Sequence, residues 1–333
     1  MNFYTTLQKL CATPSVSGRE DPIRSLLREK IAPFAHEVYT DNLGNLIARK
    51  RGEGQGMSVM LCAHMDEIGF FVTFVEESGM IRVATAGGIS FVASAFCEVV
   101  SEKGVRGALV PEGKVKPADF SGDTFYVDIG AKSRKEAERV VRVGDFFVLA
   151  GGVRRLRGKR VCGRPLDDRV GCAAVLAIAE ELWQTPLSGD VYYVFSVQEE
   201  VGCRGARPAT FAIRPDYALC FDVTGTGDTP GAGTMACSLG GGAAVKIKDN
   251  SVICHEEVVR KLCALAKEKK IPYQRELLTY GGTDTSAMQL TGAGSRAGAL
   301  SIPCRYIHSG VETCDLGDAE ACVALAAEFV RSL

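Results

Sequence analysis

The sequence has no excess of charge of one sign and no long apolar run. Its 333 residues include 39 Lys and Arg against 40 Asp and Glu, for a formal net charge of −1. That balance gives no electrostatic reason to expect nucleic acid or an anionic membrane surface as a partner. No apolar run approaches the roughly 20 residues that span a bilayer, and the first residues lack the basic-then-apolar order of a signal peptide. We therefore expect a cytoplasmic protein with neither nucleic-acid nor membrane partners.

The sequence also lacks clustered cysteines. Although it has 13 of them, an odd number, no two form a Cys-x-x-Cys pair. A secreted disulfide framework or a structural zinc knuckle would bring its cysteines together in the sequence. We expect most of these side chains to be small core residues in a reducing compartment.

The order of apolar segments predicts two architectures in one chain. From Gly69 to about Arg160, short β-rich runs are separated by glycine-bearing turns, as in small barrels or sandwiches. On either side of this stretch, helical and strand-like segments alternate, which favours an α/β sheet with helices on both faces. We predict a discontinuous α/β domain, residues 1–68 plus 161–333, with a mixed sheet flanked by helices. A β-rich, barrel-like domain at 69–160 would be inserted into it.

Individual elements follow from the apolar periodicity. The strands expected in the α/β part are Leu43–Arg49, Met57–Ala63, Val191–Val197 and Tyr217–Asp222. The helical segments expected there are residues 5–31 with a turn at Thr13–Gly18, Asp168–Trp183, Arg204–Phe211, Ser251–Lys270 and Ala319–Ser332. In the insertion we expect strands at Phe70–Val75, Met80–Thr85, Ala95–Ser101, Thr124–Ile129 and Asp145–Ala150, and one helix near Ser133–Arg139.

Two adjacent carboxylates, Glu199 and Glu200, follow a β-branched and aromatic run that begins at Val194 and is typical of a buried strand. Like charges held close raise each other's pKa, so such a pair is costly unless a cation lies nearby. One carboxylate would then bind metal while its neighbour acts as a base on metal-bound water. The alternative is a solvated surface pair, because charged residues mostly lie at the surface.

Histidine is scarce, and two of the four histidines lie at strand ends among acids. His64 follows the apolar run Val59–Ala63, and Asp66 comes two residues later. In an extended segment that spacing points both side chains the same way. Asp66 would then hydrogen-bond a ring nitrogen of His64 and fix its tautomer. The alternative is a strand-end histidine whose ring is satisfied by a backbone carbonyl. His308 also follows a short apolar and aromatic run.

Other acids precede a helix or end a strand. Asp167 and Asp168 come just before an expected helix, where one acid can cap the helix while the other faces a site. Asp222 ends an expected strand, and ligands of open α/β sheets collect at the carboxyl edge of the strands. The side chains expected at that edge are His64, Glu199, Glu200, Asp222 and His308. Such a set suits a pair of divalent ions, namely zinc, cobalt or manganese.

Five segments in this order resemble the signatures of one family across nearly the whole chain. The segments are Ala63–Phe70, Leu166–Cys172, Gln198–Gly202 with Arg204–Ala206, Gly281–Asp284 and Ile307–Ser309. The family is that of the tetrahedral (TET-type) aminopeptidases, which includes glutamyl and deblocking aminopeptidases and proteins labelled endoglucanase-like. The resemblance implies a metallo-aminopeptidase that acts on short peptides with two divalent metal ions per subunit.

The resemblance also implies which residues hold the ions. His64, Asp167 and Asp222 would bind one ion, and Asp167, Glu200 and His308 would bind the other, so that Asp167 bridges the two. Zinc or cobalt would be the first choice of metal, and manganese the next. The native metal stays open, because zinc and cobalt accept the same ligands.

Further roles are implied in the same way. Glu199 would be the general base, and Asp66 would orient the metal-binding histidine. The β-rich insertion would mediate dimerisation, and dimers of this family commonly assemble into a hollow dodecamer. The sequence departs from the pattern at Asp168, where Asn is also common, and at Gly310, where proline is frequent. The second departure puts the conformation of the loop that carries His308 in doubt.

Other functions remain open from the residues alone. A metal-dependent deacylase or carboxypeptidase would use a similar arrangement at the edge of the sheet. A catalytically inactive, shell-forming protein of the same fold is a third alternative. The endoglucanase label is less credible, because glycosidases use two opposed carboxylates and need no paired metals. The sequence does not disclose the preferred N-terminal residue, whether acylated N-termini are accepted, or whether the dodecamer forms.

Overall fold

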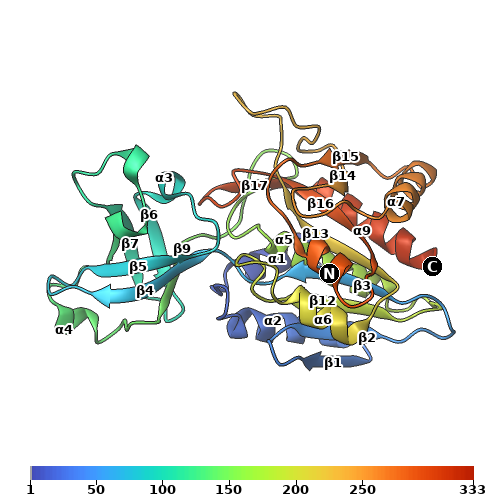
Figure 1. The fold of residues 1–333 in the computed structure, drawn as a ribbon, viewed down its shortest axis with the longest axis horizontal. Coiled ribbons are helices and arrows are strands. Elements are labelled where there is room, and N and C mark those ends of the chain that lie inside the picture. The colour runs from blue at the N-terminus through green and yellow to red at the C-terminus, as the bar shows by residue number, and fades with distance from the viewer. Residues whose placement is uncertain (1) are drawn as a thin grey trace.

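The computed structural model describes residues 2–333 and places them in two β-structures of different kinds. One is an 11-stranded sheet with the order β1-β2-β12-β3-β13-β16-β17-β11-β10, to which β14 and β15 are joined through β16. The other is a closed barrel with the order β4-β5-β8-β7-β6-β9. Figure 1 shows the barrel on the left and the sheet with its helices on the right. In the described part of the chain, no helix has the length and apolarity to cross a membrane.

Three parallel strands form the centre of the large sheet. They are β3 (Val59–His64), β12 (Val191–Ser196) and β13 (Tyr217–Thr224), and nearly all of their side chains are buried. Strands buried on both faces have near-continuous apolar sequences, as these do. The register pairs Ser196 with His64. The three strands therefore end at one edge, and the residues that follow them emerge together.

Alternation along β3 divides its side chains between two layers of helices. Leu61 and Ala63 pack in the core cluster that includes α1, α2, α5, α7 and α9, whereas Met60 and Cys62 pack with residues of α6 and α8. Successive residues of a strand point to opposite faces, so a helix layer on each face can bury the whole strand. The result is a three-layer arrangement with the sheet in the middle (Figure 1).

The remaining elements of this part complete the layers. Its other strands are β1 (Glu37–Thr40), β2 (Leu46–Lys50), β10 (Arg154–Arg155), β11 (Arg160–Gly163), β14 (Ala243–Lys248), β15 (Tyr273–Leu277), β16 (Arg296–Arg305) and β17 (Glu312–Asp315). Its helices are α1 (Phe3–Cys11), α2 (Asp21–Ile31), α5 (Arg169–Leu182), α6 (Ala206–Ile213), α7 (Glu256–Glu268), α8 (Asp284–Leu290) and α9 (Leu316–Arg331), with a 3₁₀ turn at Ala32–Phe34.

The barrel is built from one continuous part of the chain. Its antiparallel strands are β4 (Gly69–Val75), β5 (Ile81–Ala86), β6 (Cys97–Ser101), β7 (Arg106–Pro111), β8 (Phe125–Asp128) and β9 (Phe146–Leu149), with short helices α3 (Phe91–Ser94) and α4 (Arg134–Ala137) and 3₁₀ turns at Pro117–Asp119 and Gly122–Thr124. Its interior is a separate apolar cluster that includes Phe70, Phe125 and Phe147. Closing the sheet leaves no strand edge open to pair with another chain.

The predicted fold class is confirmed, with differences in detail. The expected strands and helices are present, and their ends shift by a few residues, the largest shift being the later start of α7. Helices α3 and α8 were not expected, nor were strands β1, β7, β10, β11, β14, β15, β16 and β17. In β16 the apolar run is broken by Gly298 and Pro303, residues that are depleted in strands. Pairing with β13 and β14 supplies the stability that local propensity lacks.

Candidate active site

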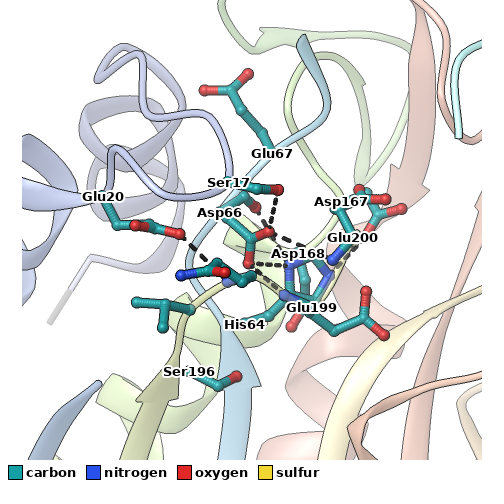
Figure 2. A network of polar contacts seen from close by, with 12 residues as sticks. Ser17, Glu20, His64, Asp66, Glu67, Asp167, Asp168, Ser196, Glu199 and Glu200 are labelled. Atoms are coloured by element: carbon teal, nitrogen blue, oxygen red, sulfur yellow. Dashed lines mark hydrogen bonds and ion pairs between the residues drawn. The ribbon is translucent and has the colours of Figure 1, made fainter. Parts of the chain in front are cut away.

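Five segments that are distant in the sequence bring acids and histidines to the carboxyl edge of the sheet. β3 ends at His64, the loop after β12 carries Glu199 and Glu200, and Asp222 lies near the end of β13. His308 lies in the turn after β16. Asp167 comes from the loop between β11 and α5, and Figure 2 shows it near His64 and Glu200. The structure thus gathers every residue that the sequence placed at this edge.

His64 turns its Nε2 atom toward two carboxylates. The atom lies 3.1 Å from Asp167 Oδ1 and 3.8 Å from Asp222 Oδ1. On the other side of the ring, Nδ1 is 3.2 Å from the backbone carbonyl of Asp66 and 3.5 Å from its carboxylate. The nearest partner of Nδ1 is therefore the carbonyl and not the side chain that the spacing predicted. A proton held on Nδ1 leaves Nε2 as the acceptor that a metal ion uses.

The carboxylate of Asp66 serves mainly to hold the Glu-Glu pair. It is fully buried and accepts hydrogen bonds from the backbone N–H groups of Glu199 at 3.0 Å and Glu200 at 3.3 Å. The Ser17 hydroxyl donates to the same carboxylate at 2.6 Å. Figure 2 shows Asp66 at the centre of these contacts. Orientation of His64 and of the two glutamates thus depends on one residue.

Asp167 lies between the two histidines. Its Oδ1 faces His64, while its Oδ2 is 3.2 Å from His308 Nε2, and Glu200 Oε2 is also 3.2 Å from that nitrogen. The Nδ1 atom of His308 is 2.6 Å from the backbone carbonyl of Gly88, which belongs to the barrel part of the chain. Both histidines therefore present Nε2 inward. The glycine at position 310 does not move His308 away from the site.

The acids of the site are buried with little positive charge to balance them. Burial raises the pKa of Asp222, Glu199 and Glu200. For His308, burial alone would disfavour the protonated form, but the hydrogen bonds with Asp167 and Glu200 raise its pKa to about 11. The negative charge of the neighbouring carboxylates thus favours the protonated, positively charged form of the histidines.

Asp168 adds a buried carboxylate to this edge. Its Oδ1 accepts a hydrogen bond from the backbone N–H of Gly171 at 3.0 Å and so caps α5, while Oδ2 is buried and has no hydrogen-bond partner within residues 2–333. Asp168 therefore caps the helix and Asp167 faces the histidines, as the sequence allowed. Burial raises the pKa of Asp168 well above its usual value.

The donor atoms fit divalent cations. Two of the donor sets whose atoms lie within 4.8 Å of one another include His64, namely His64 with Asp167 and Glu200, and His64 with Asp168 and Asp222. Imidazole nitrogen and carboxylate oxygen are ligands of zinc and of other borderline divalent ions. Asp168, whose Oδ2 has no hydrogen-bond partner among the described residues, belongs to the second of these sets.

Glu312 is a site residue that sequence reasoning missed. Its buried carboxylate accepts hydrogen bonds from the backbone N–H groups of Leu166 at 2.6 Å and Asp167 at 3.2 Å, and from that of His308 at 3.0 Å. Burial, together with the charge of Asp167, raises the pKa of Glu312 to about 7. The only signal in the sequence was its place four residues after His308.

A cavity of about 650 Å³ opens beside these side chains. Glu199 and His308 line it on one side, and Thr224, Tyr280 and Tyr306 line it elsewhere. Arg305 also borders the cavity, with its guanidinium paired to Asp228 at 2.6 Å. The space is large enough for the end of a peptide next to the acids.

The sheet thus carries metal-type donor atoms and a cavity at its carboxyl edge. A family profile described as M42 glutamyl aminopeptidase matches residues 44–325. The chain belongs to this family of aminopeptidases.

Two relatives are similar to this chain over nearly their full length. A protein of Acetivibrio thermocellus is 43% identical over 330 residues, which are 99% of this chain and 98% of that protein. The lysyl aminopeptidase of Pyrococcus furiosus is 35% identical over 343 residues, covering 99% of this chain and 97% of that one.

Solved structures of such proteins share the fold. Aminopeptidase APDkam598 from the archaeon Desulfurococcus kamchatkensis gives a TM-score of 0.95 at 35% identity, covering 99% of this chain and 95% of that one. The Pyrococcus horikoshii TET1 peptidase, described as able to assemble into a tetrahedron or a large octahedral shell, gives 0.89 at 34% identity over 100% of both chains.

The Glu312→Gln variant tests the contribution of the hidden carboxylate. The amide cannot accept from the N–H groups of Asp167 and His308 on both of its sides, so both segments should shift and metal affinity should fall by about 10–100-fold. The measurement is metal content after dialysis against graded chelator. Glu320→Gln, at an exposed acid of α9, is the control. Equal metal retention in the two variants would show that Glu312 has no such role.

Proposed function

We propose that this protein is a dinuclear metal-dependent aminopeptidase that removes N-terminal residues from short peptides. The observation that carries the proposal is the position of Asp167, whose two oxygens face different histidines at 3.1 and 3.2 Å. A carboxylate in that position can bridge two cations. Membership of an aminopeptidase family supports the peptide substrate.

The proposed ligands divide into two sets around the bridging residue. His64, Asp167 and Asp222 hold one ion, and Asp167, Glu200 and His308 hold the other. Support comes from the inward Nε2 atoms of both histidines and from side chains that are mostly buried. The metals we propose are zinc or cobalt, with manganese next, since all three accept nitrogen and carboxylate ligands.

The residues of the chain supply the remaining chemistry. Divalent cations at these ligands would provide Lewis acidity that polarises the substrate carbonyl and acidifies water. Glu199, which lines the cavity, takes a proton from the attacking water and returns it to the departing amine. Asp66 holds the backbone of Glu199 in place through its N–H group. The free α-amine of a peptide pairs with the acids of the site, so one residue is removed at a time.

We also propose how the chain divides and assembles. Residues 1–68 and 161–333 form the catalytic domain, and residues 69–160 form an inserted domain that mediates dimerisation, with dimers assembling into a dodecamer. Large exposed apolar side chains on the barrel support this role, including Val92 at 65% and Phe96 at 75% exposure. The shell-forming relative supports the larger assembly. All thirteen cysteines are free thiols, in keeping with a cytoplasmic location.

A panel of matched peptides, free and N-acetylated, tests the reaction class. Metal-reconstituted protein should release single residues in order from free N-termini and leave the acetylated peptides intact. The rank of release rates across the panel gives the side-chain preference. Cleavage confined to blocked peptides would make the protein a deacylase, and release from the other end would make it a carboxypeptidase. No cleavage by metal-loaded protein would leave a catalytically inactive shell.

The Glu199→Gln variant tests the proposed base. The amide cannot accept a proton, so kcat should fall by about 10²–10⁴-fold, while the content of the two metals stays unchanged because Glu199 is not among their ligands. Steady-state kinetics and metal analysis of the same sample provide both readings. Glu268→Gln, at an exposed acid of α7, should keep full activity. Substantial turnover in Glu199→Gln would assign the base to another residue.

The Val92→Asp variant tests the role of the barrel in assembly. A buried charge at the dimer contact is costly, so the variant should have a lower native mass than the unaltered protein in size-exclusion chromatography with light scattering. Ile253→Asp alters an equally exposed apolar residue outside the barrel and should leave the dimer intact. If the double variant Val92→Asp/Phe96→Asp kept the original mass, dimerisation would have to use another surface.

A further inference from the structure

A third group of metal-type donors includes the proposed base and differs from the two proposed ligand sets. It consists of Glu199 and Cys203 from the turn after β12 and Asp284 from the start of α8. One ligand atom of each residue lies within 4.8 Å of the other two. Cys203 stands between the two parts of the motif that carried the family resemblance, so it is not part of that signature.

The contacts of Cys203 hold its sulfur against the base. The Sγ–H group donates to Glu199 Oε1 at 3.1 Å, and the backbone N–H of Cys203 donates to the carbonyl of Glu199 at 2.8 Å. The positive φ of 51° at Cys203 belongs to this tight turn. The thiol is half-buried and lines the large cavity, so an ion from solvent can reach it.

Asp284 provides an independent sign that the group can take a cation. Its side chain is 1% exposed, and Oδ2 accepts a hydrogen bond from Ser196 at 2.5 Å. Its Oδ1 is buried and has no hydrogen-bond partner among the described residues. A buried carboxylate oxygen without a donor is costly, and a bound cation would remove that cost.

The chemistry of the donors selects the ion. One thiolate and two carboxylates suit zinc or cadmium, whereas magnesium and calcium prefer oxygen ligands alone. The half-buried position of Cys203 leaves room for water as a fourth ligand, which zinc uses in open sites. Binding releases the thiol proton to solvent, so that Zn²⁺ faces three negative ligands.

We propose that Glu199, Cys203 and Asp284 form an inhibitory site for zinc, separate from the two-metal centre. An ion held there occupies the carboxylate that would otherwise accept the proton of the attacking water. Excess zinc therefore stops turnover without displacing either metal of the centre. The inhibitory effect rests on the proposed role of Glu199 as the general base. Binding of the ion does not depend on that role.

Cobalt provides a direct reading of this site. The proposed two-metal centre has no sulfur ligand, so thiolate-to-cobalt charge-transfer absorption can come only from a cysteine site. Titration of protein that already holds two Co²⁺ per subunit should produce this absorption with the third equivalent. It should be absent in Cys203→Ser and retained in Cys263→Ser, which alters a half-buried cysteine of α7. No absorption, or absorption that survives in Cys203→Ser, would overturn the site.

Inhibition curves test the consequence. Each variant is measured against its own rate without excess zinc, so a change in basal activity does not affect the comparison. Cys203→Ser should raise the half-inhibitory zinc concentration by more than about tenfold, because losing a ligand costs at least as much as losing an outer partner. Asp284→Asn keeps the acceptor for Ser196 and should act in the same direction. Unchanged inhibition in both variants would overturn the proposal.

The two experiments separate failure of the site from failure of the proposed function. If the protein cleaves no peptide, the cobalt absorption still decides whether the site exists. If the absorption depends on Cys203 but excess zinc leaves turnover intact, the inhibitory role is wrong and Glu199 is not the base.

Discussion

The structure depends on the placement of several carboxylates of like charge at one buried edge of a sheet. Asp167, Asp168 and Asp222 are each no more than 6% exposed, and the two histidines among them can supply at most two positive charges. Such an arrangement raises the free energy of the folded chain unless cations are bound there. The sheet, its helix layers and the loops at its edge therefore have to hold groups that repel one another until a metal binds.

Backbone N–H groups provide much of that restraint. Asp66 accepts from the N–H groups of Glu199 and Glu200, and Glu312 accepts from those of Asp167 and His308. A buried carboxylate that accepts several backbone donors is stabilised and fixes the loops that carry those donors. Two buried acids, which bind no metal in the proposed scheme, thus set the positions of four residues that face the cavity. The barrel part of the chain adds a contact of another kind, in which the backbone carbonyl of Gly88 accepts a hydrogen bond from Nδ1 of His308.

Site residues could be predicted from the sequence where a polar side chain comes at or just after the end of an apolar strand. His64 and Asp222 end or nearly end such strands, so their meeting at one edge follows from parallel pairing alone. Glu312 could not be predicted, because accepting backbone N–H groups leaves no pattern of residue types. The spacing gave the direction of the Asp66 side chain, whose carboxylate lies 3.5 Å from His64 Nδ1, but not that the Asp66 carbonyl lies nearer at 3.2 Å. Strand β16 was missed because its stability comes from its neighbours on either side.

The excess of negative charge that would attract the two proposed cations would also attract a third, so charge alone does not limit the number of ions. The third group differs from the two proposed ligand sets in its donor atoms, because it includes a sulfur, that of Cys203. While the thiol keeps its proton, Sγ–H donates to the carboxylate of Glu199, the proposed base, at 3.1 Å. With zinc in excess, the proton would leave and the same sulfur would become a ligand of the proposed site. A single side chain would thus support the base under ordinary conditions and block it when zinc accumulates, without any movement of the sheet or the barrel.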